Sequence, residues 1–420
     1  MSDRDPLAGL DDIDWAALGH AYGTAEDVPG LLRGLRSGSA DEREEALHAL
    51  YGNIYHQGSR YEASAAAVPF LSRLAADPAV PGRADIVELL ASLALGFDEA
   101  HLPGGVDIAA WRAQVERLRS SDAETELRRM DEWVAQAPTE GERRVREGRR
   151  AGYDHDETVR YLLHELGAYD AVRAEVPALR GLLRDPDAGV RAAAAYTLGW
   201  FPEEAAGSLP ALHAMLRSDR VQSAGAHAIV SLGLLGGTEY VPALREALTA
   251  DRPPLLRSAA AIALAVLGVA DEEVLGALEE AAVRPPEQDV SGLIHLNGNL
   301  RGLATQTLAL VEEPAHPRLL GAMLKGLALS SGPEAFATAE AVLRTVFGQP
   351  EGAPLPPYDE LTEPQRRAVR TLAEMDDETW RWGNFMMILG AWGVPSWQAE
   401  CRAYAGLAQG GREHGAGSLR

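Results

Sequence analysis

Hydrophobic and polar positions follow a helical period through most of the chain, and the helical segments come in pairs. In each pair, an apolar segment with a Val-Pro or Leu-Pro dipeptide is followed by polar residues and then by an alanine-rich segment. Proline suits the first turn of a helix, because its φ angle is already helical and no N–H is needed there. We therefore predict that helices begin at Val28-Pro29, Val68-Pro69, Val176-Pro177, Leu209-Pro210 and Val241-Pro242.

The distance from this proline to an arginine in the second segment recurs along the chain. It is fourteen residues in three pairs, from Pro29 to Arg43, from Pro69 to Arg83 and from Pro177 to Arg191. In another pair, Gln222 stands in place of the arginine. Prolines 177, 210 and 242 follow one another after 33 and 32 residues. A period of this length indicates a repeat of helix, turn and helix.

Small residues mark the second helix of each pair, most clearly in the four alanines of VRAAAAYTLG, which starts at Val190. Packed helices lie about 8–10 Å apart, and small side chains on the contacting stripe permit such an approach. The pattern predicts an all-α fold without a β-sheet, in which antiparallel helix pairs stack into a right-handed superhelix. Such a body is longer than a globular protein of the same mass.

The unit LLRDPDAGVRAAAAYTLG, residues 182–199, resembles the HEAT repeat, and residues 31–52 and 248–268 are less complete versions of it. The resemblance implies an α-solenoid whose second helices line a concave face. It also implies a ladder of ion pairs between repeats, formed by Arg191 and by Asp185 or Asp187. The stretches NIYHQGSRYEA, WFPE and WRWGN resemble bacterial HEAT-repeat proteins of actinobacteria. That resemblance covers most of the chain and implies a fold, not an activity.

Changes in the pattern divide the chain into six parts. We expect an N-terminal cap with the first repeats in residues 1–96 and a charged helical insertion in residues 97–172. Regular repeats follow, then degenerate repeats, C-terminal capping helices and a disordered tail, in residues 173–282, 283–348, 349–408 and 409–420 respectively.

Charge and composition narrow the choice of partners. The formal net charge of −23 opposes binding to phosphate backbones, so we expect no nucleic-acid partner and favour a basic one. The acidic N-terminus has no signal-peptide pattern, and no apolar run is long enough for a membrane span. Cys401 is the only cysteine, which excludes an intramolecular disulfide. We expect a cytoplasmic protein that does not bind membranes.

No motif predicts a catalytic group, a metal site or a cofactor. The dipeptide His164-Glu165 is of interest because HEAT-like deoxyhypusine hydroxylases bind iron through several His-Glu pairs, but here it occurs once. Asp154-His155-Asp156 could bind a cation, but adjacent side chains rarely converge on one centre. Capping of the following helix by Asp156 explains this stretch more simply.

Nine polar or aromatic residues interrupt the small-residue pattern and are our candidate binding residues. They are His56, Gln57, Tyr61, Trp200, His295, Asn297, Asn299, Trp382 and Asn384. Each group also has a structural interpretation. Gly58 would end a helix in a left-handed C-cap, the asparagines would form turns and caps, and the tryptophans near Trp382 would form an aromatic core that closes the solenoid. Trp200 would either fill the space beside the alanines or anchor a partner.

Two classes of function fit these observations. The first is a non-catalytic scaffold that grips a protein or peptide, and one specific version of it is an inhibitor or immunity protein that binds a basic partner. The alternative is an enzyme that uses the solenoid groove as its active site, for example in natural-product tailoring. A deep pocket with converging polar groups would favour the enzyme, and an open surface of acids and aromatic residues would favour the scaffold.

Overall fold

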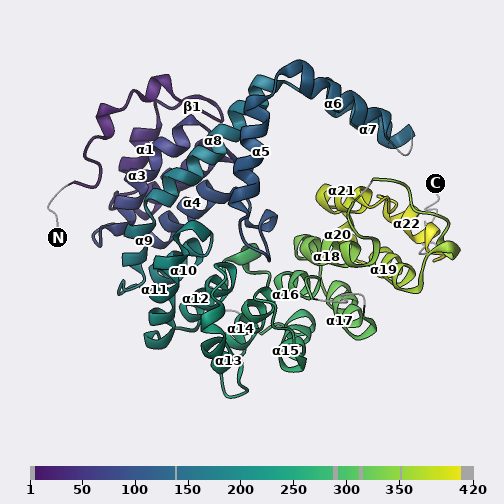
Figure 1. The fold of residues 1–420 in the computed structure, drawn as a ribbon. Coiled ribbons are helices and arrows are strands. Elements are labelled where there is room, and N and C mark those ends of the chain that lie inside the picture. Colours follow the sequence, from purple (N-terminus) through teal and green to yellow (C-terminus); the bar gives the residue numbers. More distant parts are fainter. Residues whose placement is uncertain (1–4, 138–139, 287–291, 312–315, 351, 408–420) are drawn as a thin grey trace, which may run out of the picture.

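The chain folds into an arc of two rows of helices (Figure 1). The computed structural model describes residues 5–137, 140–286, 292–311, 316–350 and 352–407. The first helices of the pairs form the outer row: α1 Val28–Gly34, α3 Glu62–Ala76, α9 Val176–Leu182, α11 Ala205–Ser218, α13 Val241–Leu248, α15 Glu272–Val283 and α17 Pro317–Ala328. From the second pair on, the second helices form the inner row: α4 Arg83–Leu95, α10 Ala188–Leu198, α12 Gln222–Leu234, α14 Pro254–Val266, α16 Leu300–Leu308 and α18 Ala335–Phe347. The second helix of the first pair, α2 Ala40–Asn53, packs against α1. The fold is thus the predicted all-α solenoid.

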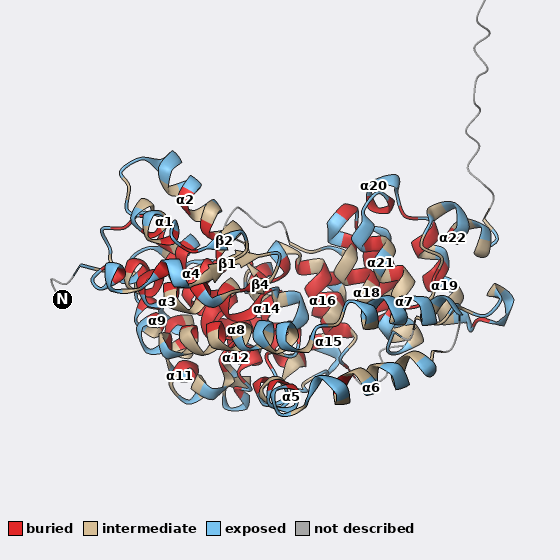
Figure 2. Cartoon of the chain, turned by 90° about the horizontal axis from the view of Figure 1, so that it is seen from above, coloured by how far each residue is buried: buried red, intermediate tan, exposed pale blue. Residues whose placement is uncertain are grey.

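Four helices interrupt the rows after α4: α5 Ile108–Ser120, α6 Ala123–Ala135, α7 Glu140–Ala151 and α8 His155–Ala174. The inner row is continuous across this interruption, because α4 packs directly against α10. α8 packs on both α3 and α4 and buries Tyr169 and Val172. α6 and α7 extend from the body as an arm, mostly exposed in Figure 2, and the Glu142 carboxylate at its far end lies against Gly352. The arm therefore spans the open side of the arc.

The C-terminal end consists of α19 Glu363–Ala373, α20 Asp377–Trp380, α21 Gly383–Ala391 and α22 Gln398–Tyr404. α19 packs against α17 and α18, and α21 packs against α18, so these helices cover the last repeat. Trp380, Phe385 and Trp392 are buried there and form the expected aromatic core. The predicted tail of residues 409–420 lies outside the described residues.

Small residues bring the inner helices close together, as the alanine pattern predicts. The side chains from Ala192 to Ala195 are buried in α10. A Cβ atom on Gly233 of α12 would lie 2.7 Å from the Cα of Ala263 in α14, a distance that real Cβ atoms do not reach. The hydroxyl of Ser231 donates to the carbonyl of Ala195 at 2.7 Å. Larger side chains at these positions would push the inner helices apart.

An arginine ladder links neighbouring repeats, as the resemblance implies, but the carboxylate partner of Arg191 is Asp219 and not Asp185 or Asp187. Arg83 donates to both carboxylate oxygens of Asp185 at 2.6 and 2.8 Å, across the inserted helices. Arg191 donates through Nε and Nη2 to Asp219 of the next repeat at 2.6 and 3.0 Å. Asp187 instead caps α10, where it accepts from the N–H of Gly189 at 2.8 Å. Each ladder arginine therefore reaches the turn of the following repeat.

Two of the five expected helix starts are wrong. α1, α9 and α13 begin at the predicted Val-Pro dipeptides, but Pro69 and Pro210 lie inside α3 and α11. The Ser64 side chain accepts from the N–H of Tyr61 and caps α3 one turn before the proline. Proline removes one N–H donor, and a helix that packs on both sides can continue past it. Asp156 is also not the cap of α8, because Asp154 accepts from the N–H of Glu157 at 2.8 Å.

The expectation of no β-structure is wrong in two places. β1 Gly19–His20 pairs with β2 Gly23–Thr24, and β3 Tyr55–His56 pairs with β4 Ser59–Arg60, as two short antiparallel hairpins. The turn of the second hairpin consists of Gln57 and Gly58, with φ angles of 49° and 84°. Positive φ at both central residues is the geometry of a tight hairpin turn. Gly58 therefore turns a hairpin and does not end a helix.

Candidate functional site

The predicted residues at the second hairpin face two different surroundings. His56 lies beside Tyr22, with ring centroids 5.3 Å apart, while Gln57 is exposed at the turn. Tyr61 is the N-cap residue of α3, and burial raises the pKa of its phenol. Residues alternate in direction along a strand, so Tyr55 and Arg60 face away from His56. The hairpin thus presents its two sides to separate parts of the surface.

The predicted residues near α16 divide into a buried histidine and two turn residues. His295 is fully buried. Asn297 is exposed and adopts a φ angle of 52°, which asparagine tolerates better than most residues. Asn299 caps α16, because its side chain accepts from the N–H of Gly302 at 2.8 Å. The capping interpretation therefore accounts for Asn299.

The predicted residues of α21 lie at the C-terminal end, apart from both other groups. Trp382 is 37% exposed and contacts Phe336 edge to face, with ring centroids 6.3 Å apart. Asn384 is exposed in the first turn of the helix. Among the nine candidates, the structure brings together Trp200 and His295, whose ring centroids lie 5.8 Å apart. Trp200 is fully buried, so it fills space beside the alanines.

Trp200 and His295 belong to a buried polar cluster beneath the inner row, together with Asp98, Tyr196 and His227. Asp98 lies in a short 3-10 helix, Asp98–Ala100, and accepts from the Tyr196 hydroxyl at 3.0 Å and from the N–H of Leu296 at 3.1 Å. The His295 ring contacts Tyr196 edge to face at 4.8 Å and stacks on His227 at 5.6 Å. The cluster joins two loops that lie almost 200 residues apart in the sequence.

Hydrogen bonds and burial fix the protonation states in this cluster. The N–H of Ile294 donates to Nε2 of His227 at 2.9 Å, and the other ring nitrogen lies 2.7 Å from the Ser223 carbonyl. His227 is therefore neutral with its proton on Nδ1, and burial lowers its pKa to about 4. Burial also raises the pKa of Asp98 to about 6. The cluster holds this carboxylate in ionised form at neutral pH at a cost in stability.

Beside the hairpin lies a second polar group, in which Asp85 is exposed and Glu88 is partly buried. We call it the acidic–aromatic face and define it by Tyr51, Tyr55, Asp85, Glu88 and Phe97. The Tyr55 ring lies 5.7 Å from that of Tyr51 and 6.3 Å from that of Phe97. Asp85 and Glu88 lie one turn apart on α4. Phe97, which follows α4, is 52% exposed.

The two acids of this face have no cationic partner among the described residues. Burial and the charge of Asp85 raise the pKa of Glu88 to about 7, and burial raises the pKa of Asp85. Burial raises the pKa of Tyr51 too, and the charges of Glu88 and Asp85 add to this effect. A partly buried carboxylate without a partner is unfavourable, and a cation placed beside it would remove that cost.

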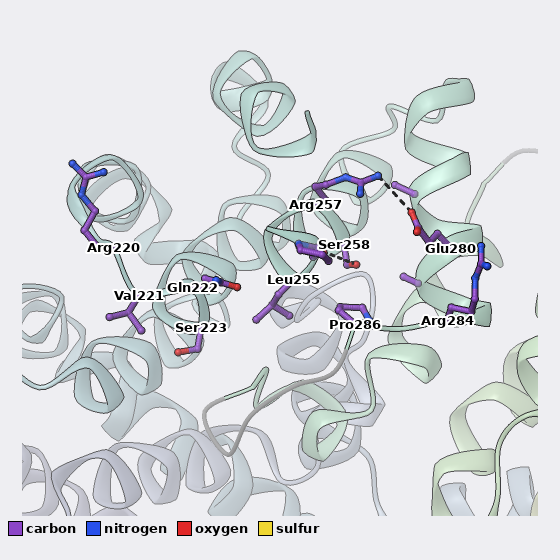
Figure 3. Close-up of a pocket in the computed structure, with 13 residues that line it drawn as sticks. Arg220, Val221, Gln222, Ser223, Leu255, Arg257, Ser258, Glu280, Arg284 and Pro286 are labelled. Atoms are coloured by element: carbon purple, nitrogen blue, oxygen red, sulfur yellow. Dashed lines mark hydrogen bonds and ion pairs between the residues drawn. The ribbon is translucent and has the colours of Figure 1, made fainter. Parts of the chain in front are cut away.

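A cavity of about 780 Å³ lies where Gln222 interrupts the arginine ladder, beside the first turns of α12 and α14 (Figure 3). Figure 3 shows Arg257 and Arg284 on either side of Glu280, and Nη2 of Arg257 lies 3.5 Å from the Glu280 carboxylate. Arg257, at this end of the cavity, therefore faces an acid of the protein itself.

Sequence reasoning missed Asp98, Glu88 and Arg60. Asp98 and Glu88 read as ordinary solvated acids, since nothing in the sequence shows that the chain folds over them. Gly96 was the one residue in the sequence that could have indicated the buried position of Arg60. Its φ angle is 75°, and a Cβ atom on it would lie 2.9 Å from the Gly58 carbonyl and overlap the Arg60 guanidinium. Glycine is required there because the helix end and the hairpin meet.

The described residues contain no group of three or more metal-ligating side chains. His164 and Glu165, the His-Glu pair considered as metal ligands, have separate partners. His164 lies 3.6 Å from Glu62, and Glu165 lies 3.4 Å from Arg60. Within the described part of the chain, no helix is both long and apolar enough to cross a membrane.

Comparison with known proteins supports the repeat. Residues 151–228 and 209–296 match the family of HEAT repeats. The chain is also similar to an engineered protein whose crystal structure is known, with 17% identity, 87% of this chain and 98% of that chain covered, and a TM-score of 0.29. No curated protein matches the chain. Two overlapping family matches and the paired rows of helices together show that residues 151–296 form HEAT repeats.

Proposed function

We propose that the chain is a binding scaffold and that its acidic–aromatic face grips a basic segment of a protein or peptide. HEAT repeats generally mediate protein interactions, and solenoids offer extended surfaces for them. The observation that carries the proposal is Glu88, a partly buried carboxyl with a raised pKa and no cationic partner in the described part of the chain. An arginine or lysine side chain would supply that partner.

The neighbouring aromatic rings support a guanidinium group in particular. Arginine stacks on aromatic faces while it donates to carboxylates, and both kinds of group are present within this face. The net charge of −23 would add long-range attraction for a basic partner. An inhibitor or immunity-type role against a basic protein is one form that this function can take.

The placement of the polar groups favours the scaffold over the enzyme. The Asp98 cluster contains the histidines and the tyrosine that acid–base chemistry would use, but Tyr196, His227 and His295 are buried in the body. Asp85 and Phe97, in contrast, are exposed. Open acids and aromatic rings are suited to holding a partner, while buried groups cannot reach a substrate.

The affinity for a labelled oligoarginine peptide tests this proposal in the full-length chain by fluorescence anisotropy. The double variant Asp85→Asn/Glu88→Gln should bind the peptide on the order of tenfold more weakly or worse, since each charged contact is worth about 1.5–3 kcal/mol. The matched control is Glu239→Gln/Glu246→Gln, which removes two exposed acids of the outer row. Equal loss in both variants would show that net charge alone attracts the peptide, and the proposal would fail.

A further inference from the structure

A cavity of about 620 Å³ lies on the inner side of the second hairpin, between the hairpin, the segment after α4, α5 and α8. Arg60 and Glu165 line it together with the aromatic residues Phe97 and Trp111. A volume of this size is typical of sites for small organic molecules, which fall between about 300 and 1,000 Å³. Its polar groups are unusual for packing alone, since they include a buried arginine.

Arg60 has one occupied edge and one free edge. Its side chain is 5% exposed. Nη1 donates to the carbonyl of Gly58 and lies 3.4 Å from Oε1 of Glu165. Nε is buried without a hydrogen-bond partner. The one hydrogen bond of this guanidinium group to a described residue is the one from Nη1, which leaves Nη2 without a hydrogen bond in that part of the chain. The donors Nε and Nη2 share one side of the guanidinium group, which is the side that binds carboxylates in a bidentate manner.

Another arginine of the same chain shows what this edge binds. Arg191 uses Nε and Nη2 to hold both oxygens of Asp219 at 2.6 and 3.0 Å. In Arg60 the same two donors face no carboxylate of the protein. Glu165 contacts the opposite nitrogen through one oxygen, and burial raises its pKa, so it is a weak partner for the arginine.

The surroundings hold Arg60 in place. Gly96 leaves no room for a Cβ atom beside the guanidinium group, and a Cβ atom on Gly58 would lie 2.7 Å from the Phe97 ring. Trp111 stacks on His101, with ring centroids 6.2 Å apart. The cavity therefore has a fixed cation and two aromatic walls, one of which is half exposed. Asp107 also lines it, but its carboxylate is engaged as the cap of α5 at 2.9 Å from the N–H of Ala110.

We propose that this cavity is a binding site for a small aromatic carboxylate, whose carboxylate occupies the free edge of Arg60 while its ring lies against Trp111 and Phe97. This site borders the acidic–aromatic face and shares Phe97 with it, but it selects the opposite charge and uses Arg60 instead of Glu88. The bound carboxylate would take the place on Arg60 that Asp219 has on Arg191.

The experiment uses three probes of one shape and different charge on the full-length chain. Phenylacetate, phenylacetamide and phenethylamine are compared by saturation-transfer NMR and by calorimetric titration. We expect saturable binding of phenylacetate and none of the amide or the amine. The absence of saturable phenylacetate binding, or equal binding of the amide, would overturn the proposal.

Two variants with opposite expected effects make the test specific. Glu165→Gln removes a competing negative charge and keeps Arg60, so phenylacetate should bind about threefold more tightly or better. Arg60→Gln should weaken binding by on the order of tenfold or more. The control is Glu157→Gln, which removes an exposed acid from the same helix α8 and should leave the affinity unchanged. Because Glu165→Gln keeps the buried arginine, weaker binding in this variant would contradict the proposal even if Arg60→Gln fails to fold.

Discussion

Arg83→Ala is expected to lower the free energy of unfolding by about 3–5 kcal/mol, the range for removing one member of a buried ion pair. The side chains of Arg83 and Asp185 are 8% and 10% exposed, and two hydrogen bonds join them. Without the arginine, the Asp185 carboxylate would be left without its main partner. Urea denaturation of the purified variant at neutral pH measures the loss.

Two comparisons separate this effect from the general loss of an arginine. Arg33→Ala breaks an ion pair with Asp11 whose members are 49% and 81% exposed, and it should cost less than about 1 kcal/mol. The double variant Arg83→Ala/Asp185→Ala should cost little more than Arg83→Ala, since the stranded carboxylate is then absent. Additive losses would show that the two residues act independently.

Asp98→Asn is expected to increase stability at neutral pH, by up to roughly 3 kcal/mol at about pH 7.5. The pKa of Asp98 in the folded chain is about 6, against an ordinary value of 3.8. When folding raises the pKa of a carboxyl group, the folded protein loses stability as the pH rises from the unfolded-state pKa to the folded-state pKa of that group. The asparagine carbonyl can still accept from Tyr196 and Leu296, so the hydrogen bonds at this position remain.

The difference between wild type and Asp98→Asn should therefore depend on pH with a known sign. It should be small near the ordinary pKa of 3.8 and should grow until the pH exceeds about 6. The two histidines are present in both proteins, so their own titration largely cancels. Asp12→Asn, at an exposed acid, should change stability by less than about 0.5 kcal/mol at every pH. A loss of stability in Asp98→Asn at neutral pH would mean that the ionised carboxylate stabilises the fold, which would contradict this prediction.

The repeat was predictable from the sequence because its determinants are local. Alanine on the inner helices, proline near the outer ones and an arginine at fixed spacing all act within one repeat or between neighbours. The same reasoning failed at Pro69 and Pro210, where packing carries a helix past a residue that usually starts one. The sequence prediction also failed at Gln57 and Gly58, because a polar residue followed by glycine is as typical of a hairpin turn as of a helix end.

The site was less predictable because its determinants are distant in the sequence. His295 and Trp200 were singled out separately, and only folding places them together. Burial raises the pKa of Asp98, while the hydrogen bonds from Leu296 and Tyr196 oppose this effect, and nothing near residue 98 encodes that burial. Arg60 is held by Gly96, which a pattern search reads as a simple helix end.

We propose above all that Glu88 forms an ion pair with a cationic group of the partner. The number of protons released on binding tests this contact most directly. The pKa of Glu88 is about 7, so this group is about half protonated at neutral pH, and a bound cation would ionise it. Calorimetric titration of the chain with oligoarginine, in two buffers of different ionisation enthalpy, gives the number of protons released. We predict that about half a proton leaves per complex near pH 7, that the number falls toward zero above about pH 9, and that Glu88→Gln releases none. Binding without proton release near neutral pH, or the same release from Glu88→Gln, would contradict the claim.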